Sequence, residues 1–146
     1  GYSMGSLPMG QEISVTMLQL AKAFSVIANG GFVVEPYIID RIVDREGHAE
    51  YERAPMPGKR ILSPETAQTM RELSHLVVTS GTGSAASIDD YRVGGKTGTA
   101  QMAKASGGGY EANKYTTVFA GFAPLNDPRV VTVIVVQEPM IKLAYG

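Results

Sequence analysis

Cysteine is absent from this chain of 146 residues. Without a thiol, the chain can form no disulfide framework, no thiolate metal site and no cysteine nucleophile. An excess of positive charge is missing too, because thirteen Lys and Arg side chains stand against fourteen Asp and Glu, for a formal charge of −1. Proteins that bind nucleic acid through its phosphates need a basic surface, so the sequence disfavours nucleic acid as a partner.

Long hydrophobic runs are missing as well. The longest apolar stretch, about Val130–Val136 with Thr132 inside it, is far shorter than the ~20 residues that span a bilayer. No basic segment followed by an apolar one opens the chain, so we expect no leader and no membrane anchor within these residues.

Glycine and proline, by contrast, are plentiful, with 17 and 8 residues. Because both interrupt long helices, the composition predicts a turn-rich domain with strands rather than a helical bundle. Hydrophobic residues make up 44% of the chain. This fraction is enough to bury a core and disfavours a wholly disordered segment.

Two segments carry helix signals. Thr16 and Gln19 have the spacing of a capping box, and Met17–Asn29 is apolar on most sides, which predicts a helix buried in a larger body. Ser63 followed by proline predicts the start of a second helix. His75 falls on or near the polar side of that second helix, and nothing in the sequence suggests a partner for it.

Strand signals occupy the remaining segments. Between the helices, β-branched residues predict strands at Phe32–Val34 and Tyr37–Asp44, with a hairpin turn leading into Ala49–Tyr51. The order of helix, small β insert, helix and then three antiparallel strands predicts an α+β fold with helices packed on an antiparallel sheet. The three later strands are expected at Arg92–Gln101, Thr116–Ala123 and Arg129–Val136.

The most distinctive segment is Gly94–Ala100, which contains Gly-Lys-Thr. A phosphate-binding P-loop requires a further glycine upstream, and Asp90 occupies that position. A P-loop also requires a helix directly after the threonine, where Gly98 and the β-branched Thr99 are poor helix formers. The P-loop interpretation is therefore excluded.

Two interpretations of this segment stay open. It is either a glycine-rich edge strand with a solvated lysine, or a strand that recognises an anion. In the second interpretation Lys96 supplies a positive charge, while Thr97 and Thr99 supply hydroxyls on one face, because alternate residues of a strand point the same way. Gly98 lets a ligand lie against the backbone, and the strand edge can accept an extended peptide.

Other candidate residues carry weaker signals. His48 falls in the expected hairpin turn and is predicted to be exposed, and Asp89–Asp90 is predicted to form a solvated turn. Two histidines without cysteine indicate no metal site. The long connection at 103–114, which contains Tyr110, is expected to be a loop.

Lys96–Thr99 resembles the Lys-Thr-Gly element of penicillin-binding proteins and active-site serine β-lactamases. The flanking sequence extends this resemblance over about residues 10–139, in the order found in class B penicillin-binding proteins. Met17 departs from the family, which commonly has proline there. The segments that carry the resemblance are Ser14–Ala21, Ala28–Gly31, Ile61–Thr66, Thr82–Ala86, Phe119–Pro124 and Val135–Pro139.

The family nucleophile lies in a Ser-x-x-Lys motif and its second motif is Ser-x-Asn, and neither pattern occurs in these 146 residues. In the family both motifs precede the stretch seen here, and a last helix follows it. The resemblance therefore implies that residues 1–146 are the C-terminal portion of a single transpeptidase domain. The N-terminal portion, which bears the nucleophile, and the last helix would lie outside the chain.

The resemblance implies that the whole protein cross-links peptidoglycan stem peptides through an acyl-serine intermediate and binds β-lactams, with no cofactor and no metal. Lys96 and Thr99 would be catalytic, through positive potential and an oxyanion-hole N–H respectively. Thr97, Gly98 and Thr99 would bind the substrate. In the family the connection equivalent to 103–114 borders the active-site cleft, which makes Tyr110 or Tyr115 a candidate substrate contact.

The family also implies the setting of the protein. It would be anchored by an N-terminal segment outside this chain, on the periplasmic or extracytoplasmic face of the bacterial membrane. It would work with cell-wall synthesis proteins in division or cell shape. The alternative is a non-catalytic binding or sensor module that kept the fold and lost the serine.

Overall fold

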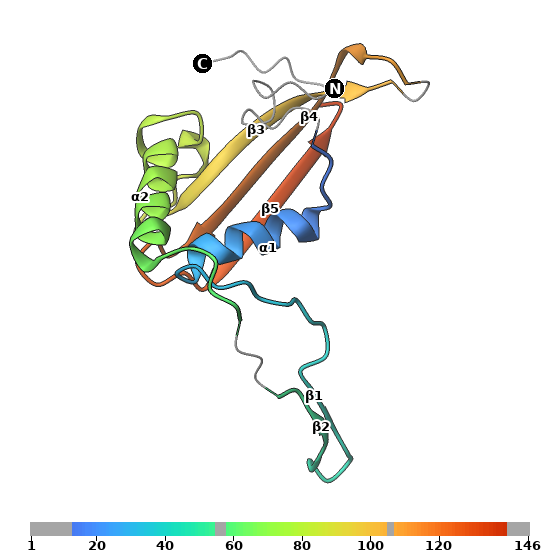
Figure 1. Cartoon of the computed structure of the whole chain (residues 1–146), viewed down its shortest axis with the longest axis vertical. Coiled ribbons are helices and arrows are strands. Elements are labelled where there is room, and N and C mark those ends of the chain that lie inside the picture. The colour runs from blue at the N-terminus through green and yellow to red at the C-terminus, as the bar shows by residue number, and fades with distance from the viewer. Residues whose placement is uncertain (1–12, 55–57, 105–106, 140–146) are drawn as a thin grey trace.

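The computed structural model describes residues 13–54, 58–104 and 107–139. Two helices and two antiparallel sheets account for the fold (Figure 1). The elements in chain order are α1 (Met17–Ala28), β1 (Arg41–Val43), β2 (Ala49–Glu52), α2 (Pro64–Ser80), the short 3₁₀ helix η2 (Ser84–Ala86), β3 (Gly94–Ala103), β4 (Tyr110–Ala123) and β5 (Val130–Gln137). The α+β class predicted from the sequence is confirmed.

The main sheet has three strands in the order β3-β4-β5, and both pairs are antiparallel. The central strand β4 pairs with β3 from Gly94 opposite Phe122 and with β5 from Ala123 opposite Val130. Strand β3 is an edge strand among the described residues. Alternate main-chain N–H and C=O groups along its outer side therefore have no strand partner there.

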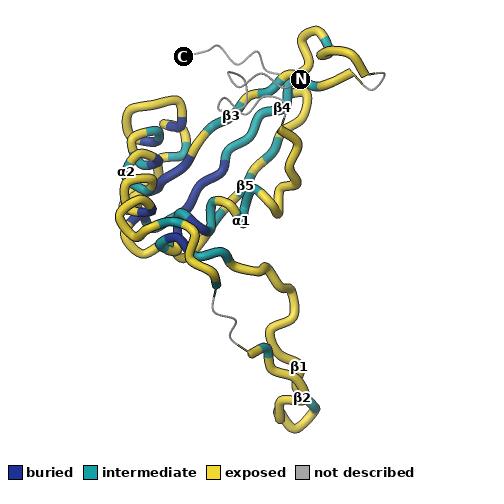
Figure 2. The backbone as a smooth tube through the Cα atoms, viewed as in Figure 1, coloured by how far each residue is buried: buried dark blue, intermediate teal, exposed yellow. Residues whose placement is uncertain are grey.

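Helix α1 covers one face of this sheet. Its start is the capping box expected from the sequence: Gln19 N–H donates to Thr16 Oγ1 at 3.2 Å, and Thr16 N–H donates to the Gln19 side chain at 2.8 Å. The last turn of α1 packs its Ala28 with Phe122 and Leu125 in the buried core (Figure 2). The first turn is solvent-exposed, so α1 is only partly the buried helix that its composition predicts.

Helix α2 runs beside β3 (Figure 1). Ser63 Oγ accepts a hydrogen bond from Thr66 N–H at 3.1 Å, and Pro64 opens the first turn, as the sequence predicts. Ala67 and Val78 are buried, and Arg71 donates to the carbonyl of Ala28 at 3.3 Å. This bond ties α2 to the C-terminal end of α1.

The described residues leave the opposite face of the sheet largely bare. Val130, Ile134 and Val136 alternate along β5 on this face, and their exposures are 59%, 54% and 46%. Small and apolar side chains line a cavity of about 540 Å³ between this face and the segment 82–88. None of the described helices is long and apolar enough to cross a membrane.

The hairpin β1–β2 extends away from the rest of the molecule (Figures 1 and 2). All seven residues of its two strands are exposed, and Ile38 before them is fully exposed. The strands are shorter than predicted: Tyr37–Asp44 contains only Arg41–Val43 as strand, and Phe32–Val34 contributes a single bridge from Phe32 to Arg60. Little tertiary packing supports the extended arm, and Pro36 interrupts its first half.

The segment 103–114, which the sequence predicts to be a loop, differs from that prediction. Strand β3 continues to Ala103 and β4 begins at Tyr110, so half of this segment, Ala103 and 110–114, belongs to the β ribbon. Ala103 pairs with Tyr110, and a register shift lies between Gln101 and Ala103. These strand ends alternate small and polar residues, so no apolar strand pattern was visible in the sequence.

Candidate functional site

Strand β3 places the four residues singled out in the sequence on its two faces. Thr97 lies opposite Phe119 and Thr99 opposite Thr117, so both threonines point to the bare face of the sheet. Lys96 lies opposite Ala120, on the face that α1 covers further along. The side chain of Lys96 and those of the two threonines therefore leave β3 on opposite faces.

The lysine side chain nevertheless returns to the strand. Lys96 is exposed, and its Nζ donates a hydrogen bond to the carbonyl oxygen of Thr97 at 2.7 Å. The charge is thereby held near the main chain at the level of Thr97. An anion that reached the outer edge of β3 here would meet the ammonium and the threonine hydroxyls from two sides.

The closest polar neighbour of the site comes from outside β3. The hydroxyls of Thr82 and Thr97 lie 2.6 Å apart, and the two residues also line the cavity on the bare face. In the sequence, Thr82 stood out only as the start of Thr82–Ala86, one of the segments that carry the family resemblance, and its contact with Thr97 was missed. The pattern gives no signal for it, because the partners are separated by 15 residues.

Gly98 has a packing reason that the sequence did not indicate. A Cβ added there would lie 2.7 Å from Cγ1 of Val118, its partner on β4. At Gly95, an added Cβ would collide with the ring of Phe119. Both glycines therefore let β3 and β4 approach closely, whatever else the strand binds.

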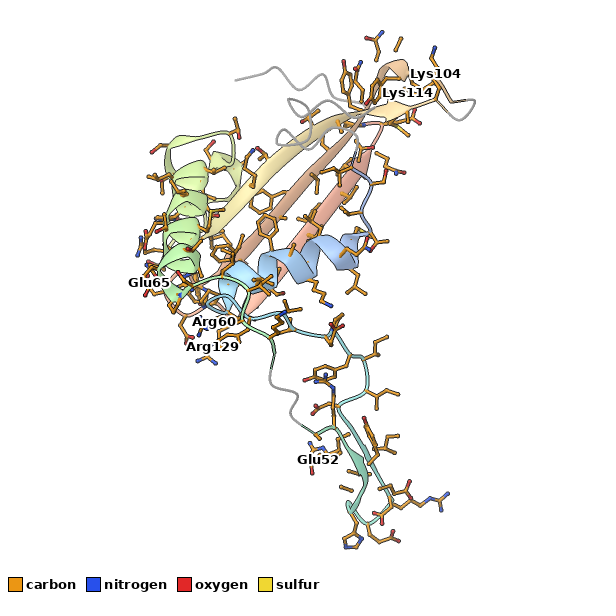
Figure 3. The ribbon with its side chains drawn as sticks, viewed as in Figure 1. Glu52, Arg60, Glu65, Lys104, Lys114 and Arg129 are labelled. Atoms are coloured by element: carbon orange, nitrogen blue, oxygen red, sulfur yellow. The ribbon has the colours of Figure 1, made fainter. Side chains whose placement is uncertain are left out.

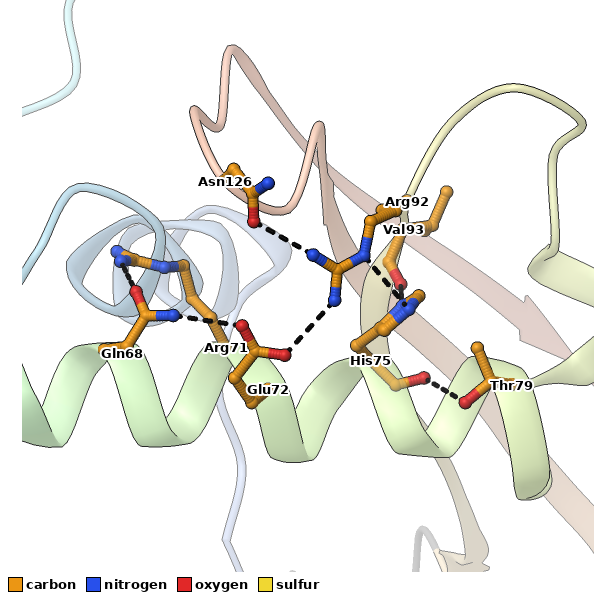
Figure 4. A network of polar contacts seen from close by, with 8 residues as sticks. All are labelled: Gln68, Arg71, Glu72, His75, Thr79, Arg92, Val93 and Asn126. Atoms are coloured by element: carbon orange, nitrogen blue, oxygen red, sulfur yellow. Dashed lines mark hydrogen bonds and ion pairs between the residues drawn. The ribbon is translucent and has the colours of Figure 1, made fainter.

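A polar network fixes the start of β3 (Figure 4). His75 Nδ1 lies 2.8 Å from the carbonyl oxygen of Val93, three residues before Lys96 in the chain. Arg92 donates to Glu72 at 3.3 Å and to Asn126 at 3.1 Å. His75 thus has a partner that nothing in the sequence suggested, since this helix face packs against β3.

The other sequence candidates lie away from Lys96. Tyr110 pairs with Ala103 and Tyr115 with Gln101, both toward the far end of the β3–β4 ribbon. Lys104 lies at that same end, while Arg129 lies at the opposite end of the sheet (Figure 3). Asp89–Asp90 forms an exposed turn with Asp90 at a φ of 65°, in line with the sequence analysis.

The hairpin tip brings together Asp44, Glu46 and His48, with ligand atoms within 4.8 Å of one another. The Asp44 carboxylate accepts hydrogen bonds from the main-chain N–H groups of His48 at 2.8 Å and Glu46 at 3.0 Å. Its other oxygen lies 3.1 Å from His48 Nδ1. These bonds lower the pKa of Asp44, that from the His48 N–H most of all. The carboxylate holds the turn together.

The fold and the site together define a class of protein: an α+β fold whose edge strand carries the sequence Lys-Thr-Gly-Thr. The family described as the penicillin-binding protein transpeptidase domain matches residues 2–146. The chain belongs to that family.

Curated relatives share this sequence along almost all of the chain. Penicillin-binding protein PbpB of Mycolicibacterium smegmatis is 40% identical over an alignment 146 positions long, which covers 95% of this chain and 22% of that protein. Stage V sporulation protein D of Bacillus subtilis is 38% identical over 138 residues, 94% of this chain and 21% of that protein. The chain thus spans about a fifth of the length of these relatives.

Two solved structures superpose on most of this chain. Penicillin-binding protein 3 from Mycobacterium tuberculosis superposes with a TM-score of 0.82 at 38% identity, over 91% of this chain and 31% of that one. The D,D-transpeptidase domain of a peptidoglycan glycosyltransferase from Eggerthella lenta gives a TM-score of 0.74 at 34% identity, over 86% of this chain and 28% of that one.

Proposed function

We propose that this chain is the C-terminal portion of the transpeptidase domain of a peptidoglycan D,D-transpeptidase. The observation that carries the proposal is the edge strand β3, where Lys96, Thr97 and Thr99 surround a strand edge without a partner among the described residues. Relatives bearing the name peptidoglycan D,D-transpeptidase support the reaction class, among them the FtsI homolog of Mesostigma viride, 32% identical over 149 residues.

In this function β3 binds the donor stem peptide as an added strand. The ammonium of Lys96 supplies positive potential and assists proton movement, and the hydroxyls of Thr97 and Thr99 bind the terminal carboxylate. Gly98 leaves the backbone open between the two threonines. The N–H of Thr99 donates to the oxyanion of the tetrahedral intermediate.

The nucleophile comes from the portion of the domain that precedes this chain. A serine there attacks the carbonyl of the penultimate D-Ala, and the bond to the terminal D-Ala breaks as that residue leaves with a proton on its nitrogen. An amine of a second stem peptide then attacks the acyl-serine ester, forms the cross-linking amide and returns the proton to the serine. No cofactor is needed for either step.

β-Lactams are proposed ligands of the same edge. Penicillin-binding protein 3 from Mycobacterium tuberculosis has been solved in complexes with ampicillin and with aztreonam. A β-lactam carries an anionic group beside a strained amide, so it offers β3 the same charge and carbonyl as the donor peptide. The acyl-enzyme that forms on the serine is the trapped state.

The bare face of the main sheet supports the proposed place of the chain in a larger domain. Exposed Val130, Ile134 and Val136 form an apolar surface that further segments of the same domain, such as a last helix, would cover. The proposal extends to a location on the extracytoplasmic face of the membrane, to an N-terminal anchor, and to partners in cell-wall synthesis during division or elongation.

Lys96→Ala tests the proposal in the full-length protein that contains this chain. Loss of the charge nearest to both anion and nucleophile should slow acylation by a fluorescent penicillin by about 100-fold or more, the order lost with one key charge-stabilising group. The matched control is Lys104→Ala, because Lys104 is exposed at the far end of the same β ribbon (Figure 3).

Acylation is measured by gel fluorescence and by intact mass, with folding verified by circular dichroism. Equal rates for Lys96→Ala and Lys104→Ala would contradict the proposed role and favour an edge strand with a solvated lysine. A full-length protein that forms no covalent adduct at all would favour the non-catalytic binding or sensor module.

A further inference from the structure

Thr82 contacts the proposed carboxylate-binding strand from a different element. Its Oγ1 lies 2.6 Å from Oγ1 of Thr97, within the range of a strong hydroxyl hydrogen bond. We propose that Thr82 is a positioning residue that donates its proton to Thr97 and so aims the Thr97 proton at the bound carboxylate. This inference rests on the proposed function and adds a residue to it.

The direction of the bond follows from the number of protons. A hydroxyl has one proton to donate and two lone pairs to accept with. If Thr97 donated to Thr82, it would turn a lone pair toward the anion and repel it. Once an anion binds, Thr97 donates to the anion and accepts from Thr82. A chain of two hydroxyls polarised in one direction is also stronger than its separate bonds.

The backbone around Thr82 is held against helix α2. Gly83 N–H donates to the carbonyl of Val77 at 2.9 Å, and Ala86 N–H donates to the carbonyl of Gly83 at 2.9 Å. A Cβ added at Gly81 would lie 2.9 Å from the Val77 oxygen, and one at Gly83 would lie 3.1 Å from it. The two glycines let the chain fold back on the last turn of α2, and this places Thr82 against β3.

The surroundings of the hydroxyl pair are apolar. Thr82 and Thr97 line the same cavity, together with Phe119 and Ile134 from the bare face of the sheet. Thr82 is exposed and Thr97 half-buried, so the pair lies where the cavity meets solvent, and the bond between the two hydroxyls orients both of them. Removal of one hydroxyl therefore changes what the other can do.

The test compares Thr82→Val, Thr82→Ser and a control, Thr79→Val, in the full-length protein. Thr79 is an exposed threonine at the end of α2, and its hydroxyl bonds to the His75 carbonyl at 3.2 Å rather than to β3. The probes are benzylpenicillin and its methyl ester, which lacks the carboxylate charge. The measured quantity is the second-order rate constant of acylation.

Thr82→Val should lower acylation by benzylpenicillin about 2- to 10-fold, the size expected for one neutral hydrogen bond. The same variant should leave acylation by the ester unchanged, because no anion is then present to orient. Thr82→Ser keeps the donor and should stay close to the parent, as should Thr79→Val. In a Thr97→Val background, Thr82→Val should cause no further loss.

Equal losses with acid and ester would overturn the inference, because they indicate a general structural role. Additive losses of Thr82→Val and Thr97→Val would also overturn it, because Thr82 would then act independently of Thr97. A failure of the proposed function is distinguishable: Thr97→Val itself would then leave the ratio of acid to ester acylation unchanged.

Discussion

At the scale of single residues, the hydrogen bond from Lys96 to the Thr97 carbonyl reveals how β3 is oriented. Because the Lys96 side chain reaches the Thr97 carbonyl oxygen, at 2.7 Å, this carbonyl group points toward the outer edge of the strand. The N–H and C=O of one strand residue point the same way, and alternate residues repeat the direction. The main-chain N–H of Thr99 therefore also points to the open edge, where the proposed oxyanion would lie.

Two substitutions at Thr99 separate its hydroxyl from its N–H. Thr99→Val removes a hydroxyl bond to a charged group and should raise the acylation barrier by ~1.5–3 kcal/mol. Thr99→Pro also removes the N–H and should cost a further ~100–1000-fold in rate. Because proline is tolerated on an edge strand whose N–H faces outward, this variant should remain folded. The measurement is acylation of the full-length protein by a fluorescent penicillin.

Rates for Thr99→Pro that match those of Thr99→Val would contradict the oxyanion role. If Thr99→Pro loses its cooperative melt, the variant is unfolded. The Thr99 N–H would then belong to the hydrogen-bond ladder with β4 and not to the open edge. Thermal melts of both variants are therefore recorded before the rates.

At the scale of elements, the tip of the β1–β2 hairpin depends on one ionised carboxylate. Hydrogen bonds from the main chain of His48 above all hold the pKa of Asp44 below its ordinary value. A group whose pKa is lowered by folding stabilises the folded turn above its unfolded pKa. That stabilisation is lost as the pH falls through the folded pKa.

The amide proton of His48 should therefore titrate in acid, with a midpoint below the ordinary Asp pKa of about 3.9. The measurement is its NMR chemical shift as a function of pH, and the control is Asp44→Asn, which should abolish this titration. A midpoint above the ordinary Asp value would contradict the role assigned to the Asp44 carboxylate.

Local signals in the sequence predicted the helices well. The capping residues Thr16 and Ser63 stand at the observed helix starts, because a cap is a contact within one turn and its spacing is visible in the sequence. The strand ends were harder. Pairing of Ala103 with Tyr110 extends β3 and β4 beyond their apolar parts, and such pairing depends on the partner strand rather than on local composition.

The candidate site was predicted in part. Lys96, Thr97 and Thr99 were found because they are neighbours in one motif, and alternation along a strand correctly places the two threonines on one face. Thr82 and His75 were missed, since their partners lie 15 and 18 residues away. Only the packing of α2 and its following loop against β3 creates those contacts.

At the scale of the whole molecule, the part of the chain that the structure describes covers one face of the main sheet and leaves the other bare. It belongs to the penicillin-binding protein transpeptidase family and spans about a fifth of the curated relatives. The proposed nucleophile motif, Ser-x-x-Lys, occurs nowhere in its 146 residues. In the proposed enzyme, this chain therefore supplies the substrate-binding strand, and the portion of the domain before it supplies the nucleophile.

The isolated chain should accordingly form no covalent adduct with a fluorescent penicillin, since none of its serines has the lysine base of that motif. Intact mass after prolonged incubation is the measurement, with the full-length protein as the positive control. A stoichiometric mass increase of the isolated chain would contradict the assignment of the nucleophile to another segment.

The two-faced arrangement of β3 has a consequence for chirality. To tell a D residue from its L mirror image, a site must hold three groups around one centre at three points that do not lie in a line. Here the ammonium starts from one face of the strand, the hydroxyls from the other, and the Thr99 N–H points outward between them. In the proposed enzyme they hold only two groups of the donor, the carboxylate of its terminal D-Ala and the carbonyl of its penultimate D-Ala. The third contact, to a methyl group, must therefore come from outside β3, and the strand alone does not select the D configuration.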